Sequence, residues 1–156
     1  MSEYGNIAVT FYHEGTKVMS FTIEQLTTGQ TASFRKTITE TDVINFASAS
    51  GDMNPVHIDK IAGKDSIFGD RVAHGILVSG LISTALGNQL PGNGTIYLGQ
   101  EMRFTRPTYI GDTITATVEV TEINKEKNRV RLKTTCTNQD GVVVITGTAT
   151  AMPPKA

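Results

Sequence analysis

The stretch HGILVSGLISTALGNQL, residues 74–90, decides the fold that the sequence predicts. Apolar residues lie all around a helix drawn through it, so we expect one helix that is buried on most sides. Pro91 and Gly92 follow directly and stop this helix. Small residues keep the helix slim, so that other backbone can approach it closely: Gly75, Ser79, Gly80 and Ser83.

The sequence after this helix is strongly β. Val and Thr dominate it with period-two alternation, which predicts strands within residues 94–107, 112–126, 128–139 and 141–153. The turns NKEKN and NQDG would join the last three strands as antiparallel neighbours. One buried helix followed by long antiparallel strands predicts an α+β domain in which the sheet wraps the helix.

The sequence before the helix has a weaker pattern. NIAVTFYH, KVMSFTI and TASFRKTIT read as short strands, and DVINFASASG reads as a helix. Thr39 and Asp42 have the spacing of a capping box at the start of that helix, and Gly51 ends it. The first residues could be an added hairpin or a loose arm. We therefore expect residues 1–20 to be an extension of unknown role and residues 21–153 to form one domain.

Composition excludes several classes of function. The chain has 156 residues and a net charge of −1, so nothing suggests a nucleic-acid footprint or an anionic membrane surface. The apolar runs are too short and too rich in Gly, Ser and Thr to span a bilayer. Cys136 is the single cysteine, and its alternating run marks it as a packed strand residue. Without an internal disulfide or a signal peptide, the expected location is the cytoplasm.

The run SASGDMNPVHIDK, residues 48–60, combines turn residues with groups that can do chemistry. In the simplest interpretation it is only a turn, in which Asp52 bonds the backbone two residues on and His57 is a satisfied buried histidine. A second interpretation is an iron site of two histidines and one carboxylate, made by His57, Asp59 and His74. The all-β scaffold usual for such a site is not evident in this sequence.

A third interpretation is general acid–base chemistry. Asp52 and His57 leave opposite ends of a tight turn, so both could face one water molecule. Negative charge developing on a substrate also needs hydrogen-bond donors. Gly75 offers one, because it lies at the N-terminus of the predicted buried helix, where N–H groups lack partners and the helix dipole favours an anion.

These residues resemble a known family. The pattern GDMNPVHID, the downstream VAHGIL and the segment GTIYLGQEMRF are similar to the MaoC-like, (R)-specific enoyl-CoA hydratases of the PhaJ type, over roughly residues 21–152. The resemblance implies a hot-dog fold, a homodimer, and an acyl-CoA thioester substrate lying along the subunit interface. The shorter members of the family begin near FTIEQLTTGQ, so the first twenty residues have no counterpart there.

The resemblance also implies roles for individual residues. Asp52 and His57 would hold the attacking water, and Gly75 would donate its N–H to the thioester carbonyl. Ser83 matches a pocket serine that supports the aspartate or shapes the acyl site, and Asn54 would support the loop. The remaining polar residues would cap or pack rather than take part in the chemistry: Asp59, His74 and Ser79.

The reaction implied is the reversible addition of water to a trans-2-enoyl-CoA, giving the (R)-3-hydroxyacyl-CoA. We expect it to need no metal and no redox cofactor. Several alternatives remain at this point: a dehydratase acting on acyl carrier protein, a hot-dog thioesterase, or a non-catalytic acyl-CoA-binding protein. Basic residues are available for the CoA phosphates, but none is assigned that role: Arg103, Arg106, Arg129, Arg131 and Lys133.

Overall fold

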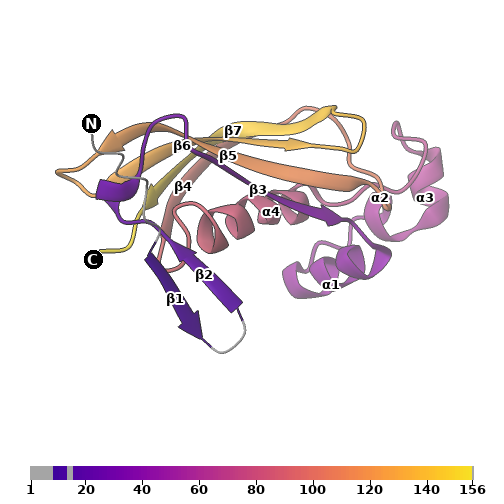
Figure 1. Ribbon diagram of the computed structural model, residues 1–156. Helices are drawn as coiled ribbons and strands as arrows, with labels where there is room; N and C mark the ends of the chain where they lie inside the picture. Colours follow the sequence, from indigo (N-terminus) through magenta and orange to yellow (C-terminus); the bar gives the residue numbers. More distant parts are fainter. Residues whose placement is uncertain (1–8, 14–15, 156) are drawn as a thin grey trace.

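A five-stranded antiparallel sheet and one helix against its face form the body of the molecule (Figure 1). The computed structural model describes residues 9–13 and 16–155. The strand order is β3-β5-β6-β7-β4, and the helix α4 spans Gly75–Asn88. This confirms the predicted α+β arrangement. The strands of the sheet are β3 Thr31–Thr37, β4 Ile96–Phe104, β5 Thr113–Asn124, β6 Arg129–Thr137 and β7 Val143–Met152.

The core lies between the sheet and α4. Along β5 the buried residues alternate with partly exposed ones, which confirms the period-two pattern read from the sequence. From the helix, Val78, Ile82 and Leu86 are almost fully buried against this face. The expectation that α4 is buried on most sides was only partly right, because Ile76 is 54% exposed and Ser83 is also exposed. One side of α4 therefore stays open in the single chain.

Three short helices lie at one end of the sheet, beyond the N-terminus of α4 (Figure 1). They are α1 Glu40–Ser50, α2 Pro55–Ile58 and α3 Lys60–Asp65. The predicted capping box is present: the Asp42 N–H donates to Thr39 Oγ1 at 3.2 Å, and the Thr39 N–H donates to the Asp42 carboxylate at 2.8 Å. Gly51 ends α1 in the left-handed conformation, with φ of 81°. These signals define where the loop to α2 begins.

The N-terminal segment includes a hairpin of β1 Val9–His13 and β2 Thr16–Ser20. Residues 1–8 and 14–15 lie outside the described residues, and with them part of the predicted strand NIAVTFYH. The strand predicted through KVMSFTI is wrong at its end, because Ile23–Gln25 forms the 3-10 helix η1. The Gln25 side chain accepts the Thr22 N–H at 2.9 Å, which favours a turn over an extended strand there.

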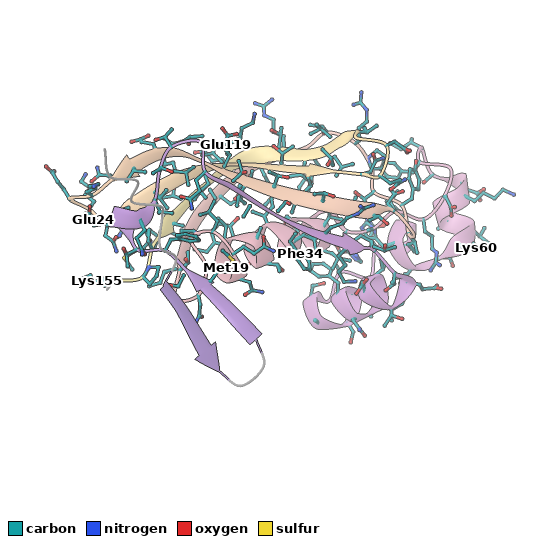
Figure 2. All side chains as sticks on the ribbon, in the orientation of Figure 1. Met19, Glu24, Phe34, Lys60, Glu119 and Lys155 are labelled. Carbon is teal, nitrogen blue, oxygen red and sulfur yellow. The ribbon has the colours of Figure 1, made fainter. Side chains whose placement is uncertain are left out.

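The hairpin is attached beside the C-terminal end of α4. The Phe21 N–H donates to the Pro91 carbonyl and the Asn93 N–H to the Met19 carbonyl, both at 2.8 Å. Met19 also packs against the core, as its place near α4 in Figure 2 shows. No helix within the described residues is long and apolar enough to cross a membrane.

Candidate active site

The loop from α1 to α2 is held by its own polar side chains. The Asp52 Oδ1 accepts the Asn54 N–H at 3.2 Å, and the Asn54 Oδ1 accepts the Val56 N–H at 3.3 Å. Asn54 is the N-cap of α2, and Pro55 is the first residue of that helix. The turn interpretation of this run is thus correct as far as it goes. The second carboxylate oxygen of Asp52, Oδ2, lies 3.9 Å from His74 Nε2.

His57 is fixed in one tautomer by the backbone. Its Nδ1 lies 2.7 Å from the carbonyl oxygen of Val72, in the segment just before α4. A carbonyl oxygen only accepts hydrogen bonds, so Nδ1 carries the proton. In the neutral imidazole, Nε2 therefore presents a lone pair. His57 is partly buried, which is compatible with contact to a substrate.

His74 takes a larger part in the site than the sequence indicated. It is the N-cap residue of α4, but its side chain makes no capping hydrogen bond. Instead its ring is only 2% exposed and stacks on His57, with the ring centres 3.8 Å apart. The ring of Phe46 in α1 also packs against His74, with the ring centres 4.8 Å apart. The sequence placed His74 next to Gly75 but carried no signal for this stack.

The two nitrogens of His74 have different surroundings. Nε2 lies 3.0 Å from the backbone carbonyl oxygen of Asp52 and must carry the proton. Nδ1 is buried and has no hydrogen-bond partner among the described residues. A buried lone pair without a partner is uncommon in a folded protein. Asp52, His57 and His74 are thus linked through both backbone and ring contacts.

The structure changes the composition of the possible metal site. One carboxylate oxygen of Asp52 and one nitrogen each of His57 and His74 lie within 4.8 Å of one another. The iron site read from the sequence used Asp59, and that choice is wrong. The Asp59 Oδ1 accepts the N–H groups of Ile61 and Ala62, both at 2.8 Å, and so caps α3.

The ring geometry also argues against a preformed metal site. The centres of His57 and His74 are 3.8 Å apart, with the ring planes inclined by 31°. Two imidazoles that bind one tetrahedral metal ion through Nδ1 or Nε2 have their ring centres roughly 5 Å apart. The stacked pair would have to open before both rings could bind one ion.

Two cavities meet at His57 and Gly75. The first has a volume of about 300 Å³ and is mostly apolar. The second, of about 340 Å³, contains Asp52 and His74. Both are lined by His57, Gly75 and Ile76. Further residues that line the first cavity include Asn54, Val56, Phe68, Val72, Phe104 and Arg106.

Gly75 and Ser83 have different relations to this junction. Gly75 is the first residue of α4, so its N–H has no acceptor within the helix and lies at the positive end of the helix dipole. Ser83 lies about two turns further along α4. It is exposed and lines neither cavity. The structure thus brings Asp52, Asn54, His57 and Gly75 together, and it places Ser83 apart from them.

Comparison with known proteins identifies the family of this chain. The family model described as the MaoC like domain matches residues 24–142. An (R)-specific enoyl-CoA hydratase of Rhodospirillum rubrum is 48% identical over 131 residues, which cover 84% of this chain and 90% of that protein. A 3-hydroxybutyryl-CoA dehydratase of Methylorubrum extorquens is 42% identical over 85% of this chain and 83% of its own length.

The fold is shared with a solved structure of a similar protein. R-hydratase PhaJ1 from Pseudomonas aeruginosa, in its unliganded form, superposes with a TM-score of 0.85 and 45% identity over 89% of both chains. This agrees with the hot-dog fold implied by the resemblance. Since both the family model and a relative of 48% identity span most of the chain, the protein belongs to the family of the MaoC-like domain.

Proposed function

We propose that this protein is an (R)-specific enoyl-CoA hydratase, a hydro-lyase that reversibly adds water to trans-2-enoyl-CoA to give (R)-3-hydroxyacyl-CoA. The observation that carries the proposal is the meeting of Asp52, His57 and the N-terminus of α4 at the junction of two cavities. The family relationship and the named activity of the relative from Rhodospirillum rubrum support it.

The proposed reaction begins with a water molecule held between Asp52 and His57. The Val72 carbonyl fixes the proton of His57 on Nδ1, so Nε2 can accept a proton from this water. The water oxygen then adds to C3 of the enoyl group, and a proton is delivered to C2. Because a carboxylate oxygen of Asp52 and a ring nitrogen of His57 lie within 4.8 Å of each other, we assign the acid and base roles to the pair rather than to either residue.

Gly75 would stabilise the charge that develops during this addition. Attack at C3 moves negative charge onto the thioester oxygen, and the Gly75 N–H at the start of α4 can donate to it. Loss of one such donor typically slows a reaction by about 10²–10³-fold. In this proposal Asn54 supports the loop, and Ser83 reaches the acyl chain only if a second subunit covers the open side of α4.

We further propose that the protein forms a homodimer through β4. This strand is at the edge of the sheet, and among the described residues no strand pairs with its outer side. Two large apolar residues of β4 are unusually exposed: Ile96 is 50% exposed and Leu98 is 45% exposed. Pairing of two β4 edges would cover these residues and extend the sheet across both chains. Light scattering should then give a mass of twice 16.8 kDa.

Cys136 has no part in the proposed chemistry. It is fully buried in β6, and burial raises the pKa of its thiol to about 12. The thiolate, which is the reactive form, is therefore scarce at neutral pH. We propose a cytoplasmic location, which suits a protein whose only cysteine is a free thiol.

The proposal is tested with purified wild-type protein and a series of enoyl-CoA esters of increasing chain length, starting from crotonyl-CoA. We expect loss of the enoyl-thioester absorbance, and oxidation of the product only by a dehydrogenase specific for (R)-3-hydroxyacyl-CoA. Parallel reactions with crotonyl-acyl carrier protein separate the two carriers. No hydration of any CoA ester would contradict the proposal. Turnover of the carrier-protein ester alone would instead make the protein an acyl-carrier-protein dehydratase.

A further inference from the structure

The side chain of Phe104 occupies the space beside Gly75. A Cβ atom added to Gly75 would lie 2.6 Å from Cε1, 2.7 Å from Cδ1 and 3.1 Å from Cζ of the Phe104 ring. Real Cβ atoms essentially never come within 3.0 Å of another heavy atom. A side chain at this position would therefore force the Phe104 ring to move from its place beside the start of α4.

Phe104 is held at this place by the end of its strand. It is the last residue of β4 and is paired in register with Ile145 of β7. The next residue, Thr105, donates its N–H to the Val144 carbonyl at 2.9 Å and its hydroxyl to the Val143 carbonyl at 2.7 Å. These bonds fix the backbone, although the Phe104 side chain is 53% exposed. The Phe104 ring thus forms part of the cavity wall while remaining partly exposed to solvent in the single chain.

This wall borders the proposed reaction centre. Phe104, His57 and Gly75 all line the cavity of about 300 Å³. A thioester oxygen that accepts the Gly75 N–H would lie ~3 Å from that nitrogen. The carbonyl carbon is bonded to this oxygen, and C2 of the acyl group is bonded to the carbonyl carbon. Both carbons would therefore lie close to Gly75 and to the Phe104 ring beside it.

We propose that Phe104 determines specificity at C2, admitting unbranched 2-enoyl thioesters and excluding those with a methyl branch at C2. This inference rests on the proposed hydratase function. The ring also limits water at the Gly75 N–H, which strengthens the interaction between that donor and the developing charge. In an apolar pocket, one additional methyl group typically changes kcat/KM by ~10–200-fold.

The specificity test compares crotonyl-CoA with 2-methylcrotonyl-CoA in the wild type, Phe104→Leu, Phe104→Ala and Phe68→Ala. We expect the ratio of kcat/KM for the branched ester over the unbranched ester to rise at least ~10-fold in Phe104→Ala and less in Phe104→Leu. Phe68 lines the same cavity, but the three heavy atoms nearest to the Gly75 Cβ position all belong to Phe104. Phe68→Ala should therefore lower kcat/KM for both esters equally. An equal change of both esters in Phe104→Ala would overturn the inference.

A second test examines the contact itself. Gly75→Ala keeps the backbone N–H but collides with the Phe104 ring, which must move, so we expect slower crotonyl-CoA hydration. Phe104→Ala should relieve the collision, so that the double variant hydrates crotonyl-CoA at least ~10-fold faster than Gly75→Ala. If the double variant shows no recovery, the contact does not constrain the site and the inference fails.

These experiments distinguish a failure of the specificity inference from a failure of the proposed function. A wild type that hydrates crotonyl-CoA but gives the same ester ratio as Phe104→Ala would overturn the specificity inference and leave the proposed function intact. A folded wild type with no hydratase activity would overturn both. The thermal midpoints of Gly75→Ala and of the double variant show in either case whether the ring and the glycine are coupled.

Discussion

The two ends of α4 differ in how their backbone and side chains are satisfied. At the C-terminal end, the Leu90 N–H donates to the Ala85 carbonyl and the Gly92 N–H to the Leu86 carbonyl, both at 2.9 Å. At the N-terminal end, the first N–H groups have no acceptor within the helix, and His74 Nδ1 is buried without a partner among the described residues.

This difference separates two tasks that one helix performs. The segment after the C-terminal end of α4 holds the N-terminal hairpin against the body of the molecule. The Pro91 carbonyl accepts the Phe21 N–H, and the Asn93 N–H donates to the Met19 carbonyl. At the N-terminal end, the first N–H groups of α4 and the Nδ1 lone pair of His74 lie close to the carboxylate of Asp52. Substitutions at the C-terminal end of α4 should therefore mainly reduce stability, and substitutions at its N-terminal end should mainly reduce activity.

The largest expected effect is on the proposed chemistry at the N-terminal end. Asp52→Asn or His57→Ala should lower kcat for crotonyl-CoA hydration by about 10²–10⁴-fold, because each removes a group that transfers or positions a proton. The thermal midpoint should stay near that of the wild type. Steady-state kinetics with circular dichroism melts measure both quantities.

Asp65→Asn is the matched control for Asp52→Asn. It removes the same charge from an exposed position at the end of α3, away from both cavities. It should leave kcat unchanged. Activity in the double variant Asp52→Asn/His57→Ala that equals the wild type would show that the assignment of these two residues is wrong.

A smaller effect, on stability, is expected at the C-terminal end. Gly92 has φ of 95°, and a Cβ there would lie 2.1 Å from the Met19 carbonyl oxygen. Gly92→Ala should therefore lower the free energy of unfolding by ~2 kcal/mol. Denaturant titration measures this, and kcat per folded molecule should be close to that of the wild type.

Gly87→Ala provides the control, inside α4 near its C-terminal end. No heavy atom lies within 4 Å of its Cβ position, so alanine should raise stability by roughly 0.5–1 kcal/mol through its better helix propensity. If Gly92→Ala were as stable as the wild type, the C-terminal end of α4 would not be the anchor described above.

The smallest effect concerns the cap of α1, the helix that carries Phe46 to His74. Burial alone would raise the pKa of the Asp42 carboxyl, but hydrogen bonds from Lys36 and Thr39 outweigh it and hold the pKa below its usual value. Asp42→Ala should therefore cost about 1 kcal/mol of unfolding free energy at neutral pH. Chemical denaturation at several pH values measures the difference.

The sign of the pH dependence follows from the lowered pKa. The contribution of Asp42 is fully present above the unfolded pKa of about 4 and is lost as the pH falls through the lower folded pKa. The difference between the wild type and Asp42→Ala should therefore shrink in acid. Lys36→Met, which keeps the bonds from Thr39, should cost less than Asp42→Ala. A difference that grows on acidification would contradict this account.

Local patterns were sufficient to predict most of the fold. The capping box at Thr39, the stop at Gly51 and the alternation along β5 are interactions between residues close in sequence or repeated with one period. The same is true of the loop containing Asp52 and His57, because its turn residues lie within the run itself. Gly75 was found because a helix start has free N–H groups whatever surrounds it.

Contacts between distant segments were not predictable from these patterns. The stack of His57 on His74 depends on the Val72 carbonyl that orients the first ring, and the place of Phe104 depends on the pairing of β4 with β7. The open side of α4 was also missed, because a helix that is apolar all around does not show which side lacks a neighbour. Asp59 was put into a metal site because helix capping and metal binding use the same carboxylate oxygens.

The order of strands has a consequence for synthesis of the chain. In the part of the chain that the structure describes, β4, the first long strand after α4, pairs only with β7, the last strand. β3 has no neighbour in the sheet until β5 is synthesised. During synthesis, the apolar helix α4 therefore leaves the ribosome before the strands of the sheet that covers it have all been made. Such delayed, non-local pairing slows folding and leaves the nascent chain in need of protection from aggregation.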